Sequence, residues 1–160
     1  MTLVFRMIFA FLLTLNGSFQ LNVRDERLSG TTWYVTFIAG TSQPINPLQF
    51  KIDFDLRPSS TPGLPHMITG RMICNYLFAD YSSPITGSLN ITDWTTTTAA
   101  CFPESDLNRE REFATNMKLI ATYQVESGPG HRTLTFYDAS KFVVLRFITL
   151  NQAYLPIVTR

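Results

Sequence analysis

The 160-residue chain has only two histidines and two cysteines, and none of the four lies in a catalytic or metal-binding motif. His66 and His131 stand far apart beside proline or glycine, and no H-x-x-x-H, C-x-x-C or H-E-x-x-H spacing occurs. The chain also lacks a G-x-S-x-G segment, a glycine-rich phosphate loop and an isolated acidic pair in an apolar setting. We therefore expect no enzyme, no cofactor and no metal site.

Clusters of charge of one sign are missing as well. Charged residues make up 16% of the chain, and the formal net charge is +1. Arg109 and Arg111 stand close together, but they are surrounded by acidic residues. Nucleic acids and anionic membrane surfaces select for clustered lysine and arginine, so the sequence predicts neither as a partner.

The N-terminal hydrophobic run is too short for a membrane-spanning helix, which needs about 20 apolar residues. Arg6 precedes the uncharged segment Met7–Leu15, and the small residues Gly17 and Ser18 follow it. This order is typical of a secretory signal peptide over residues 1–18; the alternative is an uncleaved anchor. No cysteine precedes Cys74, which excludes lipid attachment at an N-terminal cysteine. We expect a secreted or periplasmic monomer without a stable membrane span after cleavage.

What the chain does have is the composition of one well-packed domain, 45% hydrophobic and 13% aromatic. Segments rich in β-branched and aromatic residues predict an antiparallel sheet, which hides its edges by curling into a barrel. The clearest segment is Leu48–Leu56, whose alternation predicts a half-buried strand with Asp53 and Asp55 on its water-facing side. The other expected strands are Thr32–Ile38, Met67–Ile73, Asn75–Tyr81, Ser88–Trp94, Thr95–Cys101, Leu119–Glu126, Thr133–Tyr137 and Phe142–Ile148.

One segment breaks the strand pattern. Ser105 or Asp106 is expected to cap a helix in which residues recur near helical spacing, among them Leu107, Ala114 and Met117, with Phe113 beside them. The predicted fold class is therefore mainly β with one amphipathic α-helix. The C-terminal tail, residues 148–160, is apolar enough to pack on the domain.

Cys74 and Cys101 leave three roles open: a nucleophile beside a histidine, a metal ligand, or a disulfide. In an exported chain an even cysteine count favours the disulfide. With about 28 residues in the closed loop, the chain-entropy model gives about 3–4 kcal/mol of stabilisation. Separately, Asn90 begins an Asn-Ile-Thr sequence that fits the N-glycosylation acceptor pattern.

Several short motifs, taken together in order and spacing, resemble the META/HslJ domain family. The resemblance runs from Leu28-Ser-Gly-Thr-Thr-Trp-Tyr-Val35 to the closing hairpin and covers residues 28–147. Ile73 and Ala79 depart from the family pattern, which commonly has a small residue and a glycine there. The positions that match family motifs are Trp33, Gly70, Cys74, Asn75, Tyr81, Thr97, Cys101, Glu110 and Phe113.

The resemblance implies a small, lipocalin-like, partly closed β-barrel with one helix and no established catalytic residues. It implies an exported or envelope protein associated with stress tolerance or virulence. We interpret Cys74 and Cys101 as a disulfide between neighbouring strands, and Asn75 as a structural residue that bonds backbone at a turn or the barrel end. The expected function is non-enzymatic binding of an unidentified protein partner. The alternative is a carrier of a small apolar ligand, although 13 phenylalanines and six tyrosines favour a filled interior.

Overall fold

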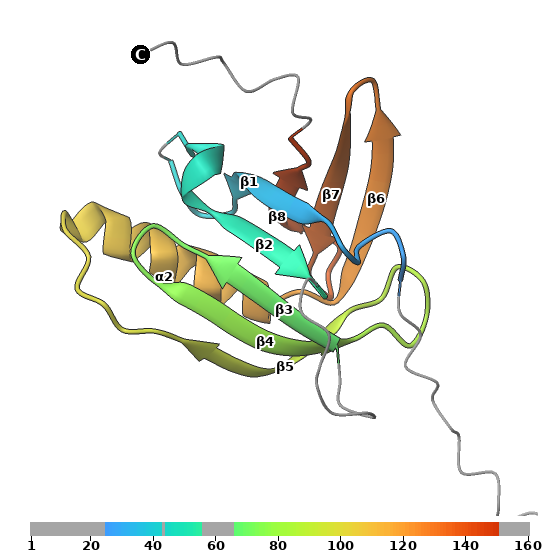
Figure 1. The fold of residues 1–160 in the computed structure, drawn as a ribbon, viewed down its shortest axis with the longest axis horizontal. Coiled ribbons are helices and arrows are strands. Elements are labelled where there is room, and N and C mark those ends of the chain that lie inside the picture. Colours follow the sequence, from blue (N-terminus) through green and yellow to red (C-terminus); the bar gives the residue numbers. More distant parts are fainter. Residues whose placement is uncertain (1–24, 43, 56–65, 151–160) are drawn as a thin grey trace, which may run out of the picture.

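The computed structural model describes residues 25–42, 44–55 and 66–150. They form an eight-stranded antiparallel sheet with one α-helix and a short 3-10 turn (Figure 1). The elements in chain order are β1 (Thr32–Ile38), η1 (Pro47–Gln49), β2 (Lys51–Phe54), β3 (His66–Arg71), β4 (Tyr76–Ser82), β5 (Asn90–Thr96), α2 (Glu104–Lys118), β6 (Thr122–Gly128), β7 (His131–Tyr137) and β8 (Val143–Ile148).

The sheet is a partly closed barrel, as predicted. In its strand order, β5-β4-β3-β2-β1-β8-β7-β6, all consecutive strands except β5 and β6 lie side by side, and β8 lies next to β1. The two edge strands, β5 and β6, are joined by α2 along the chain. Within the described residues, their ends are linked by an isolated bridge between Ser88, just before β5, and Thr122 of β6. Backbone hydrogen bonds from Leu89 N to Ala121 O (3.1 Å) and from Tyr123 N to Gly87 O (2.8 Å) hold this corner.

Aromatic side chains fill the interior of the barrel. Trp33 lies in the core, and the rings of Phe136 and Phe147 are 5.4 Å apart at their centroids. Helix α2 packs against β8 and β1 and inserts Phe113, whose ring lies 5.3 Å from that of Phe50. The alternation of apolar residues along the strands thus produces a core made of side chains from all around the sheet.

Several strand predictions were wrong in their bounds. The segment predicted from Leu48 begins as a strand only at Lys51, because Asn46 accepts a hydrogen bond from Leu48 N and Pro47 starts the turn η1. Leu48 is therefore 60% exposed. The two strands predicted within 88–101 are one, β5, which ends at Thr96.

The helix also begins differently from the prediction. Pro103 occupies the N-cap position and no side chain caps the helix, whereas Ser105 and Asp106 lie within its first turn. Proline suits the start of a helix because its fixed φ is compatible with the first turn and its missing N–H would have had no partner there. Asp106 instead places a carboxylate near the positive end of the helix dipole.

The chain ends are described only in part. The predicted signal peptide, residues 1–18, and most of the predicted tail lie outside the described residues. Ile148 belongs to β8, and Thr149 N donates to Arg132 O at 2.9 Å, so the sheet extends into the segment that was predicted as a tail. Among the described residues, no helix is long and apolar enough to cross a membrane.

Candidate functional site

Five of the family-motif positions meet where the β3–β4 connection, the segment after β5 and helix α2 come together. They are Cys74, Asn75, Thr97, Cys101 and Glu110, and we call them the Asn75–Glu110 clamp. Sequence motifs separated by up to 36 residues are thus brought into direct contact.

Glu110 is the centre of the clamp and is only 4% exposed. Its Oε1 accepts hydrogen bonds from the backbone N–H groups of Cys74 (2.5 Å) and Asn75 (3.0 Å). Its Oε2 accepts from Nδ2 of Asn75 at 2.6 Å. A buried carboxylate is costly unless it is hydrogen-bonded, and these three donors meet that requirement. The side chain therefore ties α2 to the β3–β4 connection.

Asn75 joins the same site to the segment that follows β5. Its Oδ1 accepts from Thr97 Oγ1 (3.0 Å) and from the backbone N of Ala99 (2.6 Å). Thr97 Oγ1 also accepts from Tyr76 N at 2.9 Å. The amide thus holds the chain where regular pairing between β4 and β5 has ended. The sequence predicted contacts from Asn75 to backbone, but it gave no sign of the bond to Glu110.

The disulfide between Cys74 and Cys101 links the two segments that Asn75 also links, with the Cα atoms 5.7 Å apart. The prediction that the cysteines lie on neighbouring strands was wrong. Cys74 lies in the β3–β4 connection, and Cys101 lies between β5 and α2. Both sulfurs and a Glu110 oxygen lie within 4.8 Å of one another, a grouping that could suit a metal ion. In the disulfide, however, neither sulfur is a thiolate, which is the form that ligates metals. The clamp therefore has a structural role: it links these segments of the chain to one another.

The remaining motif residues lie away from the clamp or beneath it. Gly70 faces the interior, where an added Cβ would lie 3.0 Å from Leu77 Cδ2 and 3.2 Å from the carbonyl oxygen of Lys51. Phe113 and Trp33 are core residues. Asn90, the predicted glycosylation acceptor, is exposed at the start of β5, so its modification stays a prediction.

Asp55 forms a second cluster that the sequence did not predict. It adopts a φ of 53°, unusual for a residue other than glycine. Its Oδ2 accepts from Ser29 Oγ (2.8 Å) and Tyr81 Oη (2.5 Å), and its Oδ1 lies 3.5 Å from Nδ1 of His66. The prediction that this aspartate only keeps a strand solvated was wrong, because no alternation pattern reveals partners on three other segments.

Asp25 connects the start of the described chain to β6. Its carboxylate forms an ion pair with Arg27 at 2.7 Å and accepts a hydrogen bond from the Tyr123 hydroxyl. Burial opposes ionisation of Asp25, but the hydrogen bonds from Arg27 and Tyr123 outweigh it and lower the pKa to about 2.

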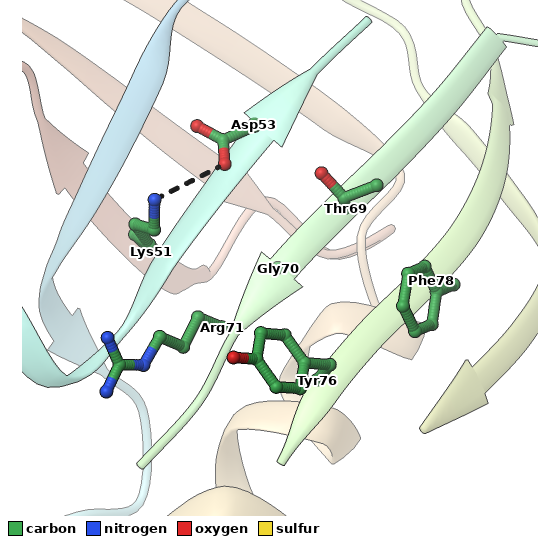
Figure 2. A pocket seen from close by; sticks show the side chains of 7 residues that line it. All are labelled: Lys51, Asp53, Thr69, Gly70, Arg71, Tyr76 and Phe78. Carbon is green, nitrogen blue, oxygen red and sulfur yellow. Dashed lines mark ion pairs between the residues drawn. The ribbon is translucent and has the colours of Figure 1, made fainter. Parts of the chain in front are cut away.

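The outer face of the sheet carries an open hollow of about 620 Å³ over β2, β3 and β4 (Figure 2). Asp53, predicted to be solvated, is only 7% exposed there, and its Oδ1 is buried without a hydrogen-bond partner among the described residues. The Lys51 ammonium lies 3.8 Å from its Oδ2. The residues that line the hollow are Lys51, Asp53, Thr69, Gly70, Arg71, Tyr76 and Phe78.

Comparison with known proteins gives one match. No curated protein sequence and no solved structure matches the chain. The META domain family matches residues 26–149, which include every described strand and the helix. The matched range contains the clamp, the aromatic core and the outer hollow. The chain therefore belongs to the META domain family.

Proposed function

We propose that the chain is an exported, non-enzymatic META domain protein that acts by binding another protein, in a role associated with stress tolerance, the cell envelope or virulence. The Cys74–Cys101 disulfide supports export, because such bonds persist in oxidising compartments. The N-terminal sequence supports it too, through the signal-peptide pattern of residues 1–18.

The observation that carries the binding proposal is the filled interior of the barrel. Fully buried aromatic rings occupy it from several strands and from α2, with Trp33, Phe54 and Phe136 among them. A protein with such a filled core binds other molecules at its surface rather than in its interior. The surface offers large hydrophobic side chains, including Tyr76 at 53% and Phe78 at 40% exposure beside the outer hollow.

The clamp supports a non-enzymatic role. The buried Glu110 carboxylate is engaged by three donors, and both cysteines are engaged in the disulfide. A general acid or base must reach a substrate, and a nucleophilic cysteine must be a thiolate. In this structure, the Glu110 carboxylate and the two sulfurs instead hold segments of the chain together.

The alternative is a carrier of a small apolar ligand, and the two functions are separable by experiment. Native mass spectrometry of the exported protein would detect a co-purified ligand, and chemical cross-linking in the exported fraction would trap a protein partner. We expect a discrete cross-linked complex and an unliganded mass. A reproducible bound lipid or other apolar molecule, without a cross-linked partner, would favour the carrier and contradict our proposal.

A further inference from the structure

A row of side chains crosses the outer face of the sheet at the hollow. The strand register pairs Tyr34 with Lys51, Lys51 with Arg71, and Arg71 with Tyr76. Since paired residues project from the same face, these four side chains form a line in which two cations stand between two tyrosines. Figure 2 shows three of them: Arg71 extends toward β2, which carries Lys51, and the Tyr76 ring lies beside Arg71.

Of the two cations, Lys51 has one acidic partner and Arg71 has none within the described part of the chain. Like charges directly opposite each other on neighbouring strands are destabilising, and Lys51 faces Arg71 in this way. Lys51 has a long ion pair with Asp53, at 3.8 Å and without a hydrogen bond, whereas the described residues supply neither a hydrogen bond nor an ion pair to Arg71. An anion placed between the two cations would remove the repulsion and accept hydrogen bonds from both.

The next row supplies an apolar contact. Its register pairs are Asp53 with Thr69 and Thr69 with Phe78, so the small Thr69 side chain leaves the hollow open between larger neighbours. Tyr76 and Phe78 present half-exposed rings at its β4 side. The ligand chemistry that fits both rows is a carboxylate next to an apolar side chain, as in a short acidic segment of a protein.

We propose that this hollow is the docking surface for the partner, and that it binds a segment in which an aspartate or glutamate lies beside an aromatic or aliphatic residue. The carboxylate binds between Lys51 and Arg71, where the planar guanidinium can form two parallel hydrogen bonds to it. The apolar side chain packs on Tyr76 and Phe78. This inference rests on the proposed protein-binding function and adds the chemistry of the partner.

A random heptapeptide library displayed on phage, selected on the immobilised mature protein, tests the proposal without knowledge of the partner. We expect enriched peptides to carry an acidic residue next to an aromatic or aliphatic one. A synthetic copy should lose about tenfold or more in affinity when its acidic residue is replaced by the corresponding amide. Arg71→Ala should cause a similar loss, whereas Arg111→Ala on α2, the same change at another exposed arginine, should bind like the wild type.

Stability separates a binding role of Arg71 from a structural one. If the arginine is kept for a ligand, Arg71→Ala relieves repulsion with Lys51 and leaves the melting temperature unchanged or higher. A library without enrichment, enriched peptides without acidic residues, or peptides that bind Arg71→Ala as tightly as the wild type would each overturn the proposal. If a cross-linked protein partner persists in Arg71→Ala, the docking surface is rejected while the protein-binding function stands.

Discussion

Replacing Asn75 with alanine removes the side chain that connects all three segments of the Asn75–Glu110 clamp. Glu110 Oε2 loses the donor that lies 2.6 Å away, in a site where Asn75 is only 4% exposed. A lost hydrogen bond to a buried charge costs about 1.5–3 kcal/mol. Ala99 N also loses its acceptor, but Ala99 is exposed and water can replace the asparagine oxygen, so this loss adds about 0.5–1 kcal/mol.

The expected destabilisation is therefore about 2–4 kcal/mol, or a fall in melting temperature on the order of 10 °C. Urea unfolding in non-reducing buffer, followed by tryptophan fluorescence, measures the free energy of unfolding directly. Asn108→Ala on the exposed side of α2 is the matched control, and surface changes of this kind stay within about 0.5 kcal/mol.

The substitution Asn75→Asp makes the test more specific to the carboxylate. It places a second carboxylate in contact with Glu110, so the variant should be less stable than Asn75→Ala near neutral pH. The proximity raises the pKa of the pair in the folded state, so the extra penalty should shrink as the pH falls and one group is protonated. If the free energy of unfolding of Asn75→Ala is within about 0.5 kcal/mol of the wild-type value, the clamp does not stabilise the fold and our reasoning is refuted.

Three further predictions concern other parts of the molecule. Cys74→Ser should lower the free energy of unfolding by about 3–4 kcal/mol in non-reducing buffer and leave it equal to that of the wild type in reductant. A stability difference that persists in reductant would contradict a stabilising disulfide. Asp25→Asn should lose about 1–2 kcal/mol at neutral pH after solvent screening is allowed for. Folding lowers the Asp25 pKa to about 2, so the greater stability of the wild type should disappear as the pH falls from about 4 toward 2. A stability difference between the two proteins that does not change with pH would exclude the lowered pKa as its cause. Gly70→Ala should destabilise by about 1–3 kcal/mol through its contacts with Leu77 and the Lys51 carbonyl, whereas Gly128→Ala, with no atom nearer than 3.6 Å, should not.

Much of the fold was predictable because its signals are local. The alternation from Phe50 to Phe54 marks the place of β2, and the strands predicted at Leu119–Glu126 and Thr133–Tyr137 correspond to the paired β6 and β7. The predicted bounds of strands and helix were wrong where a proline or a capping residue overrides the pattern of apolar residues. Asn46 and Pro47 begin a turn that includes Leu48 and Gln49, the first residues of the alternation, and Pro103 caps the helix ahead of the predicted capping residues.

The candidate sites were less predictable because they depend on residues that are distant in sequence. Trp33 and the cysteine pair carry recognisable signals, but nothing local shows that Glu110 bonds the residues around Cys74 or that Asp55 bonds Ser29 and Tyr81. The cationic pair at the hollow is equally hidden. It appears only once β2 and β3 are aligned in register.

The measurement that tests the account most directly is the intact mass of the protein exported by its natural host, alkylated with and without prior reduction. We predict a chain that begins near Phe19, lacks two hydrogens, and takes up alkylating reagent only after reduction. A full-length chain with both thiols free would contradict export and the Cys74–Cys101 bond, and would return Cys74 to consideration as a reactive residue.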